Sequence, residues 1–208
     1  MEKPVLGKQS GILTARQIDG LVESGVVRPI RPLEAVQRQP TTLDLRLGDE
    51  AIATSAGLLA LGGTVQDAMA DLAGERLDLT TGAVLRRGQI YLIKLAEELA
   101  LPEDLRARAN PRSSTGRIDV FTRTLVDRHD RFDDVPAGYH GPLWLEVLPR
   151  SFDIAVTAGQ RLNQLRFLRG RPLLADDDLG QRVIQDDLLG GATTRSLPPR
   201  RARSPGLL

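Results

Sequence analysis

The first strong pattern along the chain is helical. Thr14, followed three residues later by Gln17, has the form of a capping box, in which the two side chains satisfy each other's backbone N–H groups. The apolar residues that follow recur at helical spacing, and Gly25 stands where a helix would end. The pattern predicts an amphipathic helix over 14–24, preceded by a leader over 1–12.

The next segments change from extended to helical signals. Prolines keep 26–40 extended or looped, whereas 41–48 alternates polar and apolar residues and ends in glycine, which predicts a strand. Residues 50–55 are expected to continue this strand as its second arm. Thr64 is placed to cap a second helix, and Gly74 is placed to close that helix.

From residue 77 onward the pattern is that of short strands separated by Gly, Pro or Asp turns, which is typical of a sandwich or barrel. Residues 97–105 are predicted as a connecting turn or a short helix. We therefore expect one mainly β domain over 13–170 and a diverged, partly disordered tail over 171–208. The expected strands are 77–79, 83–85, 90–95, 118–126, 143–148, 152–156 and 164–168.

Composition supports a globular protein: the chain has 208 residues, of which 41% are hydrophobic and 26% charged. The net charge of +1 gives no global field that would favour nucleic acid or a membrane as partner. The start lacks the apolar core of a signal peptide, and no stretch is long and apolar enough for a membrane span, so we expect a cytoplasmic protein. The basic end of the tail is interpreted as a solvated terminus, the alternative being contact with nucleic acid or an acidic partner.

Cysteine is absent, which excludes disulfides, thiolate catalysis and Cys-ligated zinc. The two histidines, His129 and His140, are interpreted as turn residues rather than metal ligands. Asp119 and Asp127 remain candidates for contacts to a sugar or a water. Gln164 is a polar residue in a strand of large apolar residues.

The polar turn 112–117 is the main candidate for anion binding. It contains two consecutive serines, a glycine that allows close approach of the backbone, and an arginine at each end. Without a complete phosphate-binding motif around it, the alternative is a hydrophilic loop between strands.

Glu146 is the candidate general base. In the alternating strand 143–148 it falls on the face opposite Leu143, Leu145 and Val147. A carboxylate between large apolar neighbours lies either at a solvent edge or in a cleft, and partial burial in a cleft would suit it for proton transfer.

At these positions the sequence resembles the dCTP deaminase family, which is related to the trimeric dUTPases. The motifs occur in the family's order and close to its spacing, and the turn is most similar to the first half of the longer, two-unit members. The matching segments are 42–48, 112–117, 141–146 and 158–165.

The resemblance implies a distorted jelly-roll or β-barrel fold of the dUTPase-like β-clip type, with a short N-terminal helix and one or two small helices. It also implies a homotrimer with active sites between subunits. The implied reaction is the hydrolytic deamination of dCTP to dUTP and ammonia. No cofactor takes part in the chemistry, and Mg²⁺ is expected only on the substrate triphosphate.

The family's functional residues carry over to the matching positions. Glu146 would be the general base and acid, and Ser113 and Arg117 would position the attacking water and Glu146. Arg112 and Ser114 would hold the triphosphate. The remaining substrate contacts would come from Leu125, Val126, Asp127 and Gln164.

Two alternatives remain open. One is a dUTP diphosphatase, or a bifunctional enzyme, in which an Asp activates a water aimed at the α-phosphate. The other is a non-catalytic trimeric nucleotide-binding domain, since the family's C-terminal lid, which carries tyrosines and a Lys-Tyr pair, has no counterpart in 169–208. The resemblance also does not settle whether Asp133 or Asp134 faces the sugar.

Overall fold

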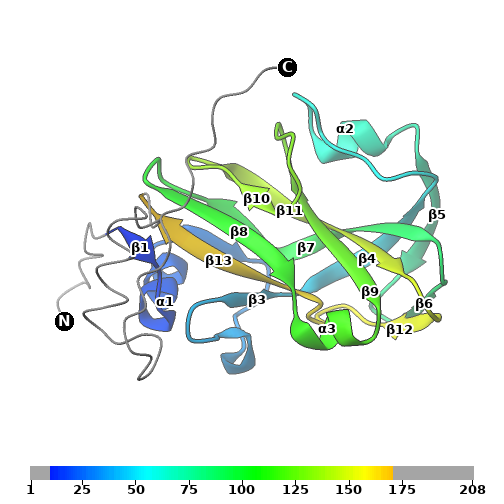
Figure 1. Cartoon of the computed structure of the whole chain (residues 1–208), viewed down its shortest axis with the longest axis horizontal. Helices are drawn as coiled ribbons and strands as arrows, with labels where there is room; N and C mark the ends of the chain where they lie inside the picture. Colours follow the sequence, from blue (N-terminus) through cyan, green and yellow to red (C-terminus); the bar gives the residue numbers. More distant parts are fainter. Residues whose placement is uncertain (1–9, 171–208) are drawn as a thin grey trace, which may run out of the picture. The chain divides into compact units, whose positions relative to one another are not determined.

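Two antiparallel sheets lie against each other in the computed structural model, which describes residues 10–170 (Figure 1). The β13 sheet runs in the order β1-β13-β8-β10, with β3 paired to β13. Its strands are β1 (Gly11–Ile12), β3 (Leu43–Leu45), β8 (Leu105–Pro111), β10 (Asp134–Val135) and β13 (Asn163–Arg169).

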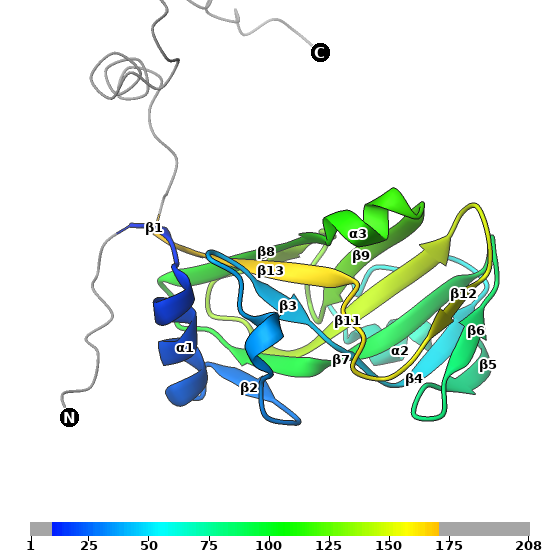
Figure 2. The ribbon, with the colours of Figure 1, turned by 90° about the horizontal axis from the view of Figure 1, so that it is seen from below.

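The β11 sheet runs in the order β5-β4-β7-β11-β9, with β2 paired to β7. Its strands are β2 (Val27–Pro29), β4 (Leu47–Thr54), β5 (Ala73–Asp78), β7 (Ile90–Ala100), β9 (Val120–Val126) and β11 (His140–Pro149). A small pair, β6 (Ala83–Leu85) with β12 (Ile154–Val156), completes the strands of the described part. Figure 2 shows this pair at the end of the fold opposite α1.

The helices are short: α1 (Ala15–Glu23), α2 (Val65–Met69), α3 (Ser113–Arg117) and a 3₁₀ turn, η1 (Ala35–Gln37). The capping box predicted for Thr14 and Gln17 is present at the start of α1. None of the helices within 10–170 is long and apolar enough to cross a membrane. The predicted class, a mainly β fold with a short N-terminal helix and small helices, is confirmed.

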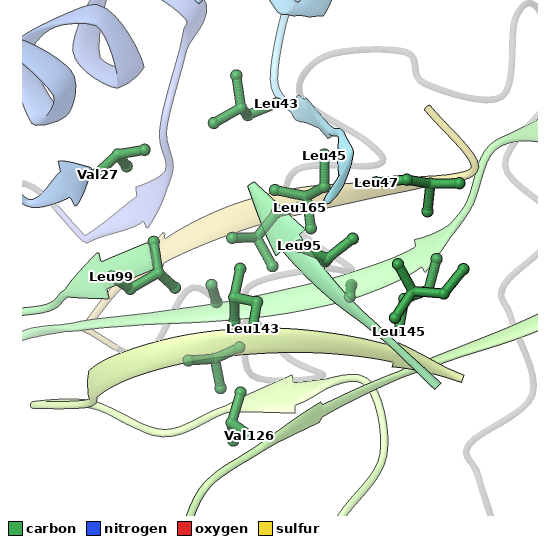
Figure 3. Close-up of a cluster of buried hydrophobic side chains, with 14 of the residues drawn as sticks. Val27, Leu43, Leu45, Leu47, Leu95, Leu99, Val126, Leu143, Leu145 and Leu165 are labelled. Atoms are coloured by element: carbon green, nitrogen blue, oxygen red, sulfur yellow. The ribbon is translucent and has the colours of Figure 1, made fainter. Parts of the chain in front are cut away.

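The core lies between the two sheets, where alternate residues of each strand point inward (Figure 3). Leu165 and Phe167 of β13 are completely buried, as are Leu143 and Leu145 of β11. Each such side chain contributes about 1.5–3 kcal/mol through the hydrophobic effect. The strand alternation read from the sequence therefore places the correct face of β11 in the core.

A second apolar cluster lies on the outer face of the β11 sheet. It joins residues of β4, β7, β9 and β11 to the segment 57–70, which contains α2 and which we call the α2 cover. Asp127 fixes this cover, because its Oδ1 accepts a hydrogen bond of 2.8 Å from the backbone N–H of Val65. The members are Ile52, Leu58, Ala60, Val65, Met69, Leu92, Leu125 and Trp144.

The prediction of a turn or short helix over 97–105 is correct for 101–104, which form a turn, but wrong for 97–100. β7 continues to Ala100, and β8 begins at Leu105. Glu97 lies fully buried within β7, where the side chains of Arg46 and Gln37 bind its carboxylate. A sequence of helix-forming residues thus continues a strand because distant side chains satisfy the buried charge.

Several boundaries also differ from the prediction, most clearly those of the second helix and of the leader. α2 ends at Met69, and Gly74 lies inside β5 rather than at a helix end. The last residues of the expected leader, Gly11 and Ile12, pair with β13. Residues 1–9 and the expected tail over 171–208 lie outside the described residues.

Candidate active site

Glu146 lies in the middle of β11 and is only 2% exposed. Its side chain points to the outer face of the β11 sheet, the face that also carries Trp144 and the α2 cover. A carboxylate buried at this depth needs a charged or hydrogen-bonding partner, because isolation from water strongly disfavours its ionised form.

Arg123 of β9 is that partner. Its Nε and Nη2 donate to Oε1 of Glu146 at 2.9 and 2.5 Å, whereas Oε2 accepts no hydrogen bond from any residue in 10–170. The centre of the guanidinium lies 3.9 Å from the ring centroid of Phe132 and 5.4 Å from that of Phe121. A cation this close to an aromatic face gains a further electrostatic attraction.

The α2 cover closes over the ion pair at Gly57. A Cβ atom at this position would lie 3.0 Å from Oε2 of Glu146 and 3.1 Å from Nη2 of Arg123. The backbone therefore passes close to both charged groups. Only a residue without a side chain leaves the pair undisturbed here.

Asp133 is the member of the Asp133–Asp134 pair that lies near Glu146. Its Oδ1 accepts a hydrogen bond of 2.8 Å from the backbone N–H of Thr124. Burial raises the pKa of Asp133, and this rise is opposed by the Thr124 hydrogen bond and by the charge of Arg123. Asp134 instead pairs with His129 at 3.0 Å and with Arg108 at 3.5 Å.

The turn 112–117 forms the short helix α3 with Arg112 as its N-cap. It is anchored to the start of β13: the backbone N–H of Arg112 and the hydroxyl of Thr115 both donate to the carbonyl oxygen of Leu162, at 3.0 and 2.9 Å. Ser113, Ser114 and Arg117 are exposed and, among the described residues, have no hydrogen-bonding or ionic partner for their side chains. Their donors are therefore available to a ligand or to another chain.

Arg112 has a second task in the fold. Its Nε lies 3.1 Å from Oδ2 of Asp44, a carboxylate that is only 1% exposed, and its Nη1 donates to the carbonyl oxygen of Arg161 at 3.2 Å. Burial raises the pKa of Asp44, and the charges of Arg112 and Arg161 oppose that rise. The guanidinium is thus oriented at the edge of the exposed turn.

Within the described chain, no hydrogen bond or ion pair connects Glu146 with Ser113 or Arg117. Arg123, which faces Glu146, stands three residues into β9, about 10 Å beyond its first residue at ~3.3 Å per residue. The helix α3 precedes that first residue. The turn and the carboxylate are consequently separate sites on one chain.

The other predicted contact residues are spread over two faces of β9 and over β13. Leu125 is buried beneath the α2 cover, whereas Val126 points into the core (Figure 3). Asp127 accepts the hydrogen bond from the backbone N–H of Val65 at the start of α2. Gln164 lies on β13 and its Oε1 accepts a hydrogen bond of 3.1 Å from Thr42. Their roles as substrate contacts stay predictions.

The described residues contain no group of three or more His, Cys, Asp or Glu side chains that could hold a metal ion. His129 lies in the loop between β9 and β10 and interacts with Asp134 of β10, and His140 lies exposed at the start of β11.

Arg123 is the site residue that the sequence did not reveal. Its only local signal is a charged residue in an alternating strand, Val120–Val126, and such residues usually face solvent. The strand pairing that sets Arg123 directly opposite Glu146 is a property of the register between β9 and β11.

Comparison with known proteins identifies the family. The family model described as the 2'-deoxycytidine 5'-triphosphate deaminase N-terminal domain matches residues 9–171. A dCTP deaminase of Haloarcula marismortui is 30% identical over 161 residues, which cover 75% of this chain and 79% of the relative. A "dCTP deaminase, dUMP-forming" of Persephonella marina is 31% identical over 159 residues, which cover 76% of this chain and 83% of the relative.

Among solved structures, the 2'-deoxycytidine 5'-triphosphate deaminase of Agrobacterium tumefaciens superposes with a TM-score of 0.80 at 42% identity. The match covers 85% of this chain but 53% of that protein, so the chain spans about half the length of this relative. The β fold, the match over 9–171 and the similarity to these enzymes confirm the resemblance, and the chain belongs to the dCTP deaminase family.

Proposed function

We propose that this protein deaminates dCTP hydrolytically, giving dUTP and ammonia, with Glu146 as the general base and acid. The observation that carries the proposal is a carboxylate that is 2% exposed in the middle of β11, in a chain of the dCTP deaminase family. A carboxylate held away from bulk water, with one free oxygen, is suited to move protons to and from a reacting base.

In the proposed reaction Oε2 of Glu146 accepts a proton from a water molecule, and the water oxygen forms a bond to C4 of cytosine. The proton moves to N3 of the ring, which gives a neutral tetrahedral intermediate. A second proton, from the new hydroxyl group, passes to the amino group, the C4–N4 bond breaks, and ammonia leaves. The products are the uracil ring and a Glu146 carboxylate in its starting state.

We further propose that Ser113 and Arg117 act from a neighbouring copy, in a homotrimer with shared sites. Two observations support this: both side chains are exposed without partners in the described chain, and no contact links them to Glu146. In the assembled site their donors would orient the water and stabilise the negative charge that develops as it attacks. Light scattering that shows only monomers would contradict this shared site.

In this proposal the turn 112–117 binds the triphosphate of the substrate. Arg112 and Ser114 would bind it together with Gln164, and Mg²⁺ would enter as part of the substrate. Nη2 of Arg112 has no partner in the described chain, while the other donors of its guanidinium are held by Asp44 and Arg161. Leu125 and Val126 at the end of β9, with Asp127 directly after it, would lie along the pyrimidine and sugar.

Two other functions are candidates. Several relatives carry the name "dCTP deaminase, dUMP-forming", which favours a bifunctional enzyme that also releases pyrophosphate. The second is a nucleotide-binding unit that does not catalyse the reaction, in which the ion pair with Arg123 beneath Gly57 would keep Glu146 from exchanging protons.

One experiment distinguishes the three. The pure protein is incubated with Mg²⁺ and dCTP, dCMP or dUTP, and ammonia and pyrophosphate are measured separately. A deaminase releases ammonia but no pyrophosphate from dCTP. A bifunctional enzyme releases both ammonia and pyrophosphate, and a binding unit releases neither. Glu146→Gln is expected to abolish ammonia release while dCTP still binds. Ammonia release that survives this substitution would refute the proposed base.

A further inference from the structure

The two carboxylate oxygens of Glu146 have different environments. Oε1 receives both hydrogen bonds from Arg123, at 2.9 and 2.5 Å, and Oε2 receives none from the described residues. We propose that Arg123 is a positioning residue of the active site: it fixes Oε1, so that Oε2 is the atom that exchanges protons with water and substrate. This inference rests on the proposed function, in which Glu146 is the general base.

The strand register sets this geometry. Arg123 of β9 and Glu146 of β11 are directly opposite each other in an antiparallel pair. Side chains at such positions project from the same face with their Cβ atoms about 4.5–5.5 Å apart. Both partners therefore stand on regular strands of one sheet, which hold a constellation more accurately than loops do.

Phe132 restricts the guanidinium from a second direction. The ring centroid lies 3.9 Å from Cζ of Arg123, and Phe132 belongs, like Asp133, to the loop between β9 and β10. The planar guanidinium can stack on this ring and still present its forked donors to Oε1, an arrangement that a lysine ammonium cannot reproduce. The strand register and the aromatic ring together determine where the donors point.

The two members of the ion pair differ in exposure. The side chain of Arg123 is 30% exposed, whereas that of Glu146 is 3% exposed. Gly57 lies over the pair on the side of Oε2 and Nη2. A nucleotide that approaches Glu146 therefore meets a carboxylate whose orientation has been fixed before binding, which is the condition for efficient proton transfer.

The test separates orientation from binding. We compare Arg123→Met and Arg123→Lys with the parent in the full chain, measuring kcat and KM for ammonia release from dCTP with Mg²⁺. Loss of the orienting group is expected to lower kcat about 100-fold, the cost of misplacing a reacting group by about 1 Å, and to leave KM largely unchanged. Lys is expected to restore part of kcat, because it keeps the charge but not the fork.

Arg76→Met is the matched control. It removes a guanidinium that pairs with a carboxylate at 2.6 Å, that of Glu50, but in a solvent-exposed pair on β4 and β5. Its kcat is expected to equal that of the parent. Phe132→Leu removes the aromatic platform and leaves both charges in place, so it keeps the proposal testable if Arg123→Met does not fold. Its kcat is expected to fall several-fold while dCTP binding persists.

The outcomes are distinct. An Arg123→Met variant with kcat equal to or above that of the parent would overturn the inference, since it would make Arg123 an obstacle or a bystander. If kcat and KM change together in both the Met and the Lys variants, the role is structural and the inference is also overturned. Survival of ammonia release in Glu146→Gln would instead refute the proposed function, and a parent that releases no ammonia would refute both.

Discussion

The most direct test of the fold concerns the buried ion pair between Arg46 and Glu97. The side chain of Glu97 is completely buried and that of Arg46 is 4% exposed. The Glu97 carboxylate accepts hydrogen bonds from Nε of Arg46 at 2.9 Å, from the backbone N–H of Arg46 at 2.9 Å and from Nε2 of Gln37 at 3.0 Å. The Arg46 guanidinium also donates to the carbonyl oxygens of Pro32 and Arg31.

The substitution Glu97→Ala leaves the arginine charge buried without its counter-ion. Removal of one partner of a buried pair costs about 3–5 kcal/mol, because the remaining charge is uncompensated in a medium of low polarity. Loss of the Gln37 bond adds about 1 kcal/mol. We therefore expect the free energy of unfolding to fall by about 4–6 kcal/mol, which approaches the whole stability of many domains.

The measurement is urea unfolding followed by circular dichroism, with the double variant Arg46→Met, Glu97→Met as the comparison. Replacing both charges by apolar groups of similar size removes the unpaired charge, so the double variant is expected to be more stable than Glu97→Ala. A cost below about 1 kcal/mol for Glu97→Ala would contradict the reasoning, since surface ion pairs contribute that little. The same result would indicate that water reaches the end of β7.

Three further outcomes are expected. Gly57→Ala places a Cβ about 3.0 Å from Oε2 of Glu146 and displaces the ion pair. We expect kcat for dCTP deamination to fall about 10-fold or more. An unchanged kcat would mean that the α2 cover moves away during turnover. Phe167→Ala is expected to lower the free energy of unfolding by about 3–5 kcal/mol in urea titrations, because this side chain is completely buried, and a cost under about 1 kcal/mol would contradict the described core. Burial raises the pKa of Asp133 above 3.8, so ionisation of this carboxyl group destabilises the folded state as the pH rises from that value. The free energy of unfolding of Asp133→Asn, relative to that of the parent, should therefore increase with pH. A difference between the two proteins that does not change with pH would refute this assignment.

Local patterns determined a large part of the fold. The capping box at Thr14 places the start of α1 because its hydrogen bonds lie within one turn of the chain. The alternation in β11 assigns Glu146 to the face opposite Leu145 because successive strand residues point to opposite faces. Both conclusions depend only on neighbouring residues, so the sequence is sufficient for them.

Other elements depend on residues that are distant in sequence. β8 escaped prediction because its alternation is between arginines and small alanines, and the alanines become part of a core face only beside Leu165 and Phe167 of β13. Residues 97–100 stay in a strand because Arg46, some fifty positions earlier, neutralises Glu97. No local rule reports such a partner.

The candidate site divides in the same way. The sequence by itself identified the candidate residues: the hydroxyls and arginines of the 112–117 turn, and the carboxylate of Glu146. Only the tertiary structure decided that Glu146 is buried, that Arg123 holds one of its oxygens, and that Gly57 lies over the pair. The physical reason is that residue type and alternation are local properties, whereas burial and charge pairing arise when separate strands are brought into register.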